Sequence, residues 1–418
     1  MTPAARIGSA IELLAEIASA ETRPADAVAN DYFRARRFIG STDRRTISDR
    51  VWSVLRSYRR LSWHLALPSF LRKQESRLLV AASLLLLERS TFSALTDLFS
   101  GARFAPSPLD ESERTTLRRL EARALDHPSM PDAVRYEVPD WLLPPLTARF
   151  GTHLADELSA LLQPAPLDLR VNLLKGTRDQ AIAALAAEGI EATPTPRSPW
   201  GLRIAGRRAV TAGKAFHAGL VEIQDEGSQL VAAITDARPS MRVADYCAGA
   251  GGKTLALAMT MQNRGTLVAC DVSSARLDAS VRRLRRAGVH NVERHLVEPG
   301  DKWAKRRAGS FDRVLLDAPC TGTGAWRRNP DARLRLTEHD LVELLHKQRE
   351  IIDRAAPLVR SGGRLVYATC SLLTEENEAQ VTDFLARDPR FVMVDALSLT
   401  PARDGTDGFF AAALERKS

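Results

Sequence analysis

The sequence contains 418 residues, of which 44% are hydrophobic and 26% are charged. This composition is typical of a folded globular protein and excludes an intrinsically disordered chain. The length allows about two or three domains. The formal net charge of +8 favours a polyanionic partner, and nucleic acid is the commonest polyanion that basic proteins bind.

The lengths of the apolar runs and the spacing of the cysteines argue against a membrane-spanning, zinc-binding or disulfide-bonded protein. The longest apolar stretch, Leu78 to Leu87, falls well short of the ~20 residues that cross a bilayer. We therefore expect no membrane partner. The four cysteines form no CxxC pair, which argues against a zinc site or a disulfide framework. We expect no metal, a cytoplasmic location and free thiols. The sequence does not fix the oligomeric state, and a monomer is the simplest expectation.

The first hundred residues predict helices. Apolar residues repeat at helical spacing from Ile7 to Ile17 and again from Ile47 to Tyr58. Ser41 to Asp43 is a suitable start for the second of these helices.

Nine arginines lie between Arg34 and Arg60, interleaved with aromatic residues. One interpretation is a solvated helical face. The other is a phosphate-binding surface, which the overall charge favours. Arg36, Arg37, Arg44 and Arg45 are its candidate residues.

Residues 102–145 are broken repeatedly by proline and predict a connector with one charged helix at 111–125. A small α+β module follows. It begins with a strand at 167–174, and Thr177 with Gln180 forms a capping box for a helix that ends near Gly189. Two short strands are expected at 190–195 and 201–205.

Beyond about residue 216, strands and helices alternate, which predicts an open parallel sheet with helices on both faces. The expected strands span 241–246, 266–271, 292–297, 311–317 and 363–369. The expected helices span 253–262, 274–287, 339–357 and 374–386. Ligands of such sheets bind outside the carboxyl ends of the strands, so the residues there are the informative ones.

The first of these strands runs into a glycine-rich loop. The P-loop pattern fails because Cys247 stands where its first glycine is required, and the dinucleotide pattern fails because position 254 is threonine. A glycine loop without a phosphate signature suits a nucleoside-like cofactor. Asp271 ends the next strand, where a carboxylate can accept hydrogen bonds from ribose hydroxyl groups.

Two cysteines follow neighbouring strand ends. Cys320 lies in the motif that runs from Asp317 to Gly324, and Cys370 lies between Thr369 and Ser371. A lone cysteine at a strand end is usually a small buried hydrophobe, and we interpret Cys247 and Cys270 in that way. Packing alone does not explain two cysteines that both stand among polar and glycine residues.

Methylation of a pyrimidine carbon would use such thiols. A thiolate that adds to carbon 6 of cytosine makes carbon 5 nucleophilic enough to attack a sulfonium methyl group. The helix expected to start at Thr374 would lower the pKa of a nearby thiol. Asp317 is placed to bind the amino edge of the base.

These motifs resemble those of the RNA 5-methylcytosine methyltransferases of the NOP2/Sun (Fmu) family. The glycine loop resembles motif I, the segment from Asp317 to Gly324 resembles motif IV, and Thr369 to Ser371 with Glu376 to Glu378 resembles motif VI. Three further segments also fit the family: Arg170-Val171-Asn172, Gln224 to Gln229, and Asp407 to Phe410. The arginine-rich N-terminus is similar to the NusB-like helical domain of bacterial members.

The resemblance implies a role for each site residue. S-adenosylmethionine would be the cofactor, with Asp271 on its ribose and Asp317 between it and the base. Cys370 would be the nucleophile, and Cys320 would assist product release. The loop residues implied to bind the cofactor are Cys247, Ala248, Gly249, Ala250, Gly251, Gly252 and Lys253. Ala250 departs from the proline that is common in the family. Glu298 is nearest to the acidic position after the third strand, with Asp301 as its competitor.

The sequence thus predicts an α/β fold with a Rossmann-like class I methyltransferase domain at 216–418. An all-helical, NusB-like RNA-binding domain at 1–135 and an α+β RNA-binding module at 136–215 would precede it. The implied activity is methylation of cytosine carbon 5 in RNA, with ribosomal RNA as the expected partner. An RNA-binding factor without catalysis and a DNA cytosine-5 methyltransferase remain alternatives, and a dithiol redox protein is a more distant one.

Overall fold

The structure is a computed structural model that describes residues 1–20, 22–68, 70–206 and 208–418. These residues separate into two compact units. The first comprises Met1–Gln163 and Trp326–Thr337, and the second comprises Pro164–Ala325 and Glu338–Ser418. The return of Trp326–Thr337 to the first unit was not anticipated from the sequence. The three predicted domain ranges remain a prediction.

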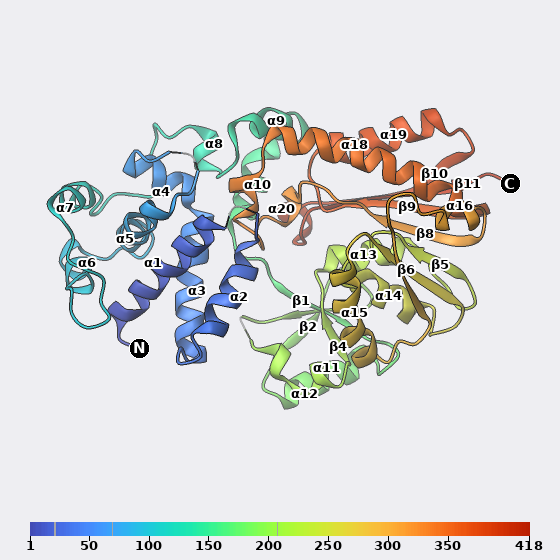
Figure 1. Ribbon diagram of the computed structural model, residues 1–418, viewed down its shortest axis with the longest axis horizontal. Helices are drawn as coiled ribbons and strands as arrows, with labels where there is room; N and C mark the ends of the chain where they lie inside the picture. The colour runs from blue at the N-terminus through green and yellow to red at the C-terminus, as the bar shows by residue number, and fades with distance from the viewer. Residues whose placement is uncertain (21, 69, 207) are drawn as a thin grey trace. The chain divides into compact units, whose positions relative to one another are not determined.

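The first unit is helical (Figure 1). Its α-helices are α1 (Pro3–Ser19), α2 (Ala25–Ala35), α3 (Ser41–Arg56), α4 (Tyr58–Leu65), α5 (Ser76–Leu86), α6 (Phe92–Leu98), α7 (Glu111–Arg118), α8 (Asp132–Arg135), α9 (Leu143–Phe150), α10 (Leu154–Leu162) and α17 (Ala332–Arg335). Helix α3 begins at Ser41, as predicted. The charged helix expected at 111–125 is shorter, because α7 ends at Arg118.

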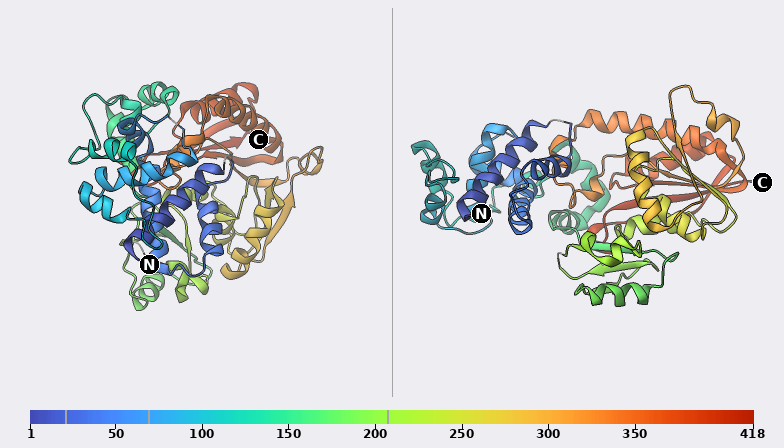
Figure 2. Two further views of the ribbon diagram at one scale, coloured as in Figure 1. Left: turned by 60° about the vertical axis from the view of Figure 1, so that its left-hand side comes forward. Right: turned by 60° about the horizontal axis from the view of Figure 1, so that its bottom comes forward.

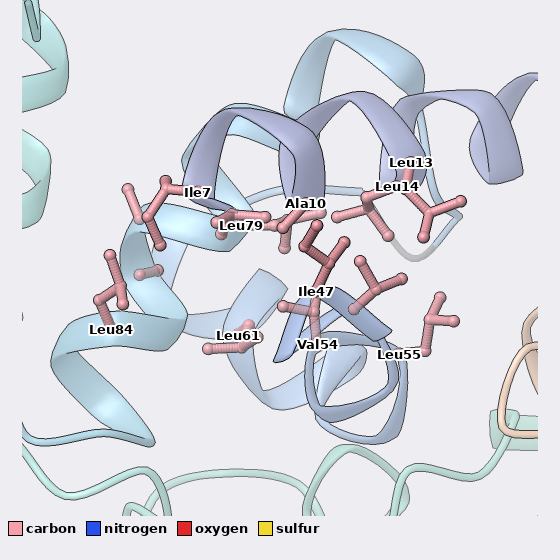
Figure 3. Packing of buried hydrophobic residues seen from close by; sticks show 14 of the residues in the cluster. Ile7, Ala10, Leu13, Leu14, Ile47, Val54, Leu55, Leu61, Leu79 and Leu84 are labelled. Atoms are coloured by element: carbon pink, nitrogen blue, oxygen red, sulfur yellow. The ribbon is translucent and has the colours of Figure 1, made fainter. Parts of the chain in front are cut away.

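The apolar faces of α1, α3, α4 and α5 form the core of this unit. Thr2 caps α1 by accepting a hydrogen bond from Ala5 N at 3.1 Å, and the apolar residues then recur on one side of the helix. Figure 3 shows Ile7 and Leu14 of α1, Ile47 of α3 and Leu79 of α5 lying in the same interior. Each of these four side chains is buried.

The second unit begins with a small antiparallel sheet in the order β2-β3-β1-β4. Its strands are β1 (Leu167–Val171), β2 (Ala192–Pro194), β3 (Gly201–Ile204) and β4 (Val221–Ile223), accompanied by α11 (Arg178–Ala187) and α12 (Lys214–His217). The capping box predicted at Thr177 and Gln180 is present at the start of α11. The sheet extends past residue 215, because β4 pairs with β1.

A seven-stranded sheet in the order β10-β11-β9-β8-β5-β6-β7 forms the larger part of this unit. Its strands are β5 (Arg242–Asp245), β6 (Thr266–Asp271), β7 (Val292–Leu296), β8 (Phe311–Asp317), β9 (Val359–Thr369), β10 (Phe391–Leu399) and β11 (Phe409–Arg416). The five strands from β5 to β9 are parallel, as predicted, whereas β10 and β11 join antiparallel and were not predicted.

Helices cover both faces of this sheet (Figures 1 and 2). They are α13 (Glu226–Ile234), α14 (Gly252–Thr260), α15 (Ser274–Ala287), α16 (Trp303–Arg306), α18 (Glu338–Ala355) and α19 (Glu378–Arg387), while the short α20 (Pro401–Asp404) connects β10 to β11. Successive strand residues point to opposite faces. Leu316 therefore packs in the core that includes Ile352 of α18, and Leu315 packs in the core that includes Leu257 of α14.

The helix expected at 374–386 starts later than predicted. Residues Thr374–Glu376 form one turn of 3₁₀-helix, and α19 begins at Glu378, after Asn377 with φ −111° and ψ −99°. The expected start at Thr374 was therefore wrong, and the helix-terminus effect on a nearby thiol loses its basis. The physical reason is that Glu376 and Asn377 point inward as hydrogen-bonding partners of other loops.

No helix among the described residues is long and apolar enough to span a membrane.

Candidate active site

The strand order reverses between β5 and β8. The chain runs outward through β5, β6 and β7 on one side and through β8 and β9 on the other. Loops that leave β5 and β8 at such a reversal diverge to opposite sides and open a crevice at the carboxyl ends of the strands. The glycine loop, Asp317 and both cysteine motifs all follow carboxyl ends of these strands.

The glycine loop is fixed by the end of β6. Gly249 N donates to Asp271 Oδ2 at 2.8 Å, and Ser273 N donates to Asp271 Oδ1 at 2.8 Å. Gly249 and Gly251 have φ values of +54° and +82°, which favour glycine. Asp271 is 5% exposed and thus holds the loop in addition to the ribose role expected for it.

Two arginines donate hydrogen bonds to backbone carbonyl groups of the glycine loop. Arg283 donates to Ala250 O at 2.7 Å, and Arg170 donates to Gly252 O at 2.9 Å. Arg170 also donates to Gln224, so two motifs that the sequence singled out meet here. Burial lowers the pKa of Arg170 to about 10, which leaves it a cation at neutral pH.

The loop geometry fits a nucleoside-like cofactor. A Cβ built on Gly249 would meet no atom within 4 Å, so the backbone is open on that side. The Val272 side chain, next to Asp271, is 76% exposed. An exposed apolar side chain beside a carboxylate can pack on a heterocyclic base while the carboxylate accepts from ribose.

Lys253 and Asp317 form an ion pair, with Nζ and Oδ2 2.7 Å apart. Burial alone would lower the pKa of Lys253, but the Asp317 carboxylate raises it, with further electrostatic contributions from Cys370 and Asp245. Lys253 is therefore a cation held by Asp317. Behind it, burial raises the pKa of Asp245 to about 7, although Thr254 Oγ1 donates to its Oδ2 at 2.6 Å.

The two motif cysteines lie together, with Cys320 Sγ and Cys370 Sγ 3.4 Å apart. Both thiols are free and half-buried. The hydrogen bond to Cys370 and burial raise the pKa of Cys320 well above its usual range. Cys320 is therefore a neutral thiol that can donate to the Cys370 sulfur.

A buried carboxylate joins the two cysteine loops. Glu376 Oε1 accepts from Thr321 N at 2.9 Å and from Gln348 Nε2 at 2.9 Å, while Oε2 accepts from Thr321 Oγ1 at 2.5 Å. Gln348 Nε2 also donates to Pro319 O at 3.0 Å. The residues on both sides of Cys320 are thus held by Glu376 and Gln348.

Gly324 is required by a close approach of two backbones. Gly408 N donates to Gly324 O at 2.9 Å, and a Cβ on Gly324 would lie 2.3 Å from Gly408 O. This contact explains the Asp407-Gly408-Phe409-Phe410 motif, which brings β11 against the motif IV loop.

The remaining candidate residues from the sequence analysis lie in different environments. Cys270 is fully buried, and burial raises the pKa of Cys247, as suits two packing thiols. Asp301 accepts from His295 at 2.6 Å and from Trp303 N at 2.7 Å, and the hydrogen bond from Trp303 N lowers its pKa. Glu298 is exposed.

Sequence reasoning missed the Lys253–Asp317 pair and Gln348. The sequence analysis did single out Lys253 as part of the glycine loop, but it assigned this residue to the cofactor and did not predict its contact with Asp317. Gln348 gave no signal, because a single glutamine on an amphipathic helix normally faces solvent.

No group of three or more histidine, cysteine, aspartate and glutamate residues among those described could hold a metal ion.

The strand order, the glycine loop and the acidic strand ends define a class I methyltransferase fold. A family model described as 16S rRNA methyltransferase RsmB/F matches residues 232–415. A second, for the ferredoxin-like domain of RsmF/B-like methyltransferases, matches residues 138–211. The chain belongs to the RsmB/F methyltransferase family, as the motifs indicated.

Curated relatives carry names that agree with this family. A ribosomal RNA small subunit methyltransferase B from Xylella fastidiosa is 38% identical over 293 residues, or 66% of this chain and 68% of that protein. Its counterpart from Pectobacterium carotovorum is 36% identical over 67% of this chain and 66% of its own length. These alignments thus leave about a third of each relative unmatched.

Solved structures agree on the fold. The crystal structure of PH0851 is 26% identical, with a TM-score of 0.81, and the match covers 100% of this chain and 99% of that chain. A methyltransferase homologue from Pyrococcus horikoshii is 27% identical, with a TM-score of 0.62, over 70% of this chain and 100% of that chain.

We predict that Asp271→Ala weakens S-adenosylmethionine binding. Loss of charge-assisted hydrogen bonds to ribose would cost about 1.5–3 kcal/mol each. Gly249 N would lose its acceptor as well, so the loop should also loosen. Calorimetric titration of the variant checks the affinity, with Glu293→Ala, an exposed carboxylate on the neighbouring strand β7, as the control. Unchanged affinity in Asp271→Ala would assign this carboxylate to loop structure alone.

Proposed function

We propose that this protein methylates carbon 5 of a cytosine in RNA, with ribosomal RNA as the substrate. S-adenosylmethionine supplies the methyl group. Membership in a methyltransferase family and the ribosomal RNA methyltransferases among its relatives support the substrate class. One observation carries the cytosine-5 chemistry: two free thiols lie 3.4 Å apart at the ends of neighbouring parallel strands.

Cys370 is the nucleophile in this proposal. Its thiolate adds to carbon 6 of the ring, and the displaced electron pair makes carbon 5 the methyl acceptor. A negative sulfur here needs a nearby positive charge. Lys253 provides one, since the charge of Cys370 contributes to the raised pKa of Lys253.

Cys320 acts in the second half of the reaction. After methyl transfer, carbon 5 loses its proton to solvent, and the electron pair of that bond expels the Cys370 thiolate. Cys320 keeps its own proton, because its pKa is raised, and its hydrogen bond stabilises the departing sulfur. A thiol without this role would not need to lie against the nucleophile.

Asp317 selects the base. Its carboxylate is 31% exposed and uses Oδ2 on Lys253, which leaves Oδ1 for the amino group of cytosine. Uracil presents a carbonyl oxygen at that position, and a carboxylate repels it. The ion pair with Lys253 orients the Asp317 carboxylate for this contact. Because a paired base is out of reach of a strand-end thiol, the target must be unstacked first.

The helical unit offers a surface for RNA phosphates. Six of the nine clustered arginines form ion pairs within it, including Arg36 with Glu16 at 3.1 Å and Arg50 with Glu88 at 2.8 Å. Arg37 is exposed beside Phe38, whose side chain is 77% exposed. Arg37 and Arg44 also line one hollow with Asn30, Phe33 and Arg34. We assign phosphate contacts to this hollow and base stacking to Phe38.

The cysteine variants test the chemistry. Cys370→Ala should abolish methyl transfer and form no covalent RNA complex. Cys320→Ala should still attack and methylate but release slowly, so that a protein–RNA adduct accumulates and survives denaturing electrophoresis. The double variant should accumulate none, because the bond requires Cys370.

Controls separate the alternatives. Cys270→Ala, which removes a buried packing thiol, should behave like the unmodified protein. DNA of the same sequence should give no adduct with Cys320→Ala. An adduct from Cys370→Ala instead would exchange the two roles and favour the DNA-type mechanism. A protein that binds RNA but neither S-adenosylmethionine nor a covalent substrate would be a binding factor.

The arginine surface predicts a salt dependence. Replacing both Arg37 and Arg44 with alanine should flatten the slope of log affinity against log salt by about 0.7–0.9 for each RNA phosphate that is no longer neutralised. Arg50→Ala is the matched control, because its guanidinium is already held by Glu88. Fluorescence anisotropy at several salt concentrations measures the slope. An equal slope in all three proteins would identify Arg37 and Arg44 as a solvated face.

A further inference from the structure

The segment Trp326–Thr337 leaves the sheet-containing unit and groups with the helical one. It follows directly after the loop that carries Cys320. The loop ends at Ala325, and the chain returns to the catalytic unit at Glu338, the first residue of α18. The helical unit therefore contains a piece of chain that directly follows the Cys320 loop and precedes α18.

Buried polar contacts hold this segment in the helical unit. Trp326 is 1% exposed and Arg333 is 2% exposed, with the Arg333 guanidinium 5.6 Å from the centre of the indole. Arg333 donates to Trp326 O and to Glu137 O, both at 3.5 Å. The fully buried Glu137 carboxyl group pairs with Arg60; burial raises its pKa, and the charges of Arg60 and Arg333 oppose that shift. A buried arginine with a buried counter-charge resists displacement, because leaving either charge unpaired is costly.

A second contact ties the segment to α2. The Asp331 carboxylate, which is buried, accepts from Ala25 N at 3.0 Å. Ala25 is the first residue of α2, where unpaired backbone N–H groups favour a negative charge. Arg335, on the last turn of the segment, pairs with Asp331 at 3.3 Å and donates to Arg23 O.

The Cys320 loop is bound within the sheet-containing unit at one end and continues into the helical unit at the other. On one side, Thr321 is bound to Glu376 and Gly324 is bound to Gly408. On the other side, the chain enters the helical unit at Trp326, six residues after Cys320. A loop anchored at both ends has less freedom than one anchored at a single end.

We propose that the helical unit positions the Cys320 loop for catalysis through the segment Trp326–Thr337, with Arg333 as the positioning residue. This inference rests on the proposed function. It gives the helical unit a role in the rate of the chemical step, distinct from its phosphate contacts. Misplacing a thiol by about 1 Å can cost 10²-fold in rate even when the substitution lies far from the chemistry.

Arg333→Met in the full chain tests the proposal, since methionine preserves much of the apolar bulk and removes the charge. Single-turnover methyl transfer at saturating RNA should fall about 10- to 100-fold, with RNA affinity within about threefold of the unmodified protein. Hydrogen–deuterium exchange of the amides in 321–325 should rise, and S-adenosylmethionine affinity should stay constant.

Arg77→Met is the matched control. Arg77 is a half-buried arginine of the same unit, paired with Glu113 at 2.8 Å and unconnected to the segment. Its loss should destabilise the helical unit while leaving the single-turnover rate and the exchange of 321–325 unchanged. If Arg333→Met does not fold, Asp331→Ala removes the acceptor of the Ala25 N–H group and should give the same loss of rate at constant RNA affinity.

Three results would overturn the proposal. They are an unchanged rate in a folded Arg333→Met or Asp331→Ala, an equal loss of rate in Arg77→Met, and a loss confined to RNA affinity. If the unmodified protein transfers no methyl group to RNA, the proposed function fails. The exchange of 321–325 then still reports whether Arg333 anchors the loop.

Discussion

The buried carboxylate of Glu376 is the contact on which the rest of the site depends. It follows the Cys370 motif in the chain, yet its two oxygens bind the backbone and hydroxyl of Thr321, next to Cys320. Gln348 from α18 completes the set by binding both Glu376 and Pro319 O. A buried carboxylate is stable only with such donors, so this one fixes three elements relative to one another.

This constraint acts on the neighbours of Cys320 more directly than on those of Cys370. Cys320 lies in a loop whose neighbours are pinned, and its hydrogen bond to Cys370 together with burial keeps it protonated. Cys370 follows the end of β9, within the electrostatic reach of the Lys253 cation. One fold thus provides a neutral thiol and a thiol beside a positive charge 3.4 Å apart. Two-step addition and elimination chemistry has a use for both.

Two buried arginines connect segments of this chain that are distant in the sequence. Arg170 links the small sheet to the glycine loop through Gly252 O, and Arg333 links the segment after the Cys320 loop to the helical residues. In both cases a guanidinium donates to backbone carbonyl groups of another segment. Its planar group supplies several directed N–H donors and remains charged when buried, which lysine does less readily. The basic composition of the chain therefore serves its architecture as well as any RNA contact.

The sequence by itself determined the parallel strands β5 to β9, because their apolar runs and the helices between them have clear periods. It also predicted both cysteine motifs, since strand ends and glycine-rich turns are local signals. It did not predict β10 and β11. Val392, Met393 and Val394 of β10 are all exposed, so this edge strand lacks the apolar alternation that marks a strand.

Only the tertiary structure decided which residues meet. Lys253 was assigned to the cofactor loop, and the fold placed its ammonium group on Asp317, 64 residues away in the chain. The fold likewise turned Glu376 inward, although its neighbours in the sequence suggested the exposed first turn of a helix. The excursion of Trp326–Thr337 into the helical unit had no local signal either. The periodicity of apolar residues shows which face of a segment is buried. The position of a buried charge depends instead on a partner that lies far away in the chain, so no local pattern predicts it.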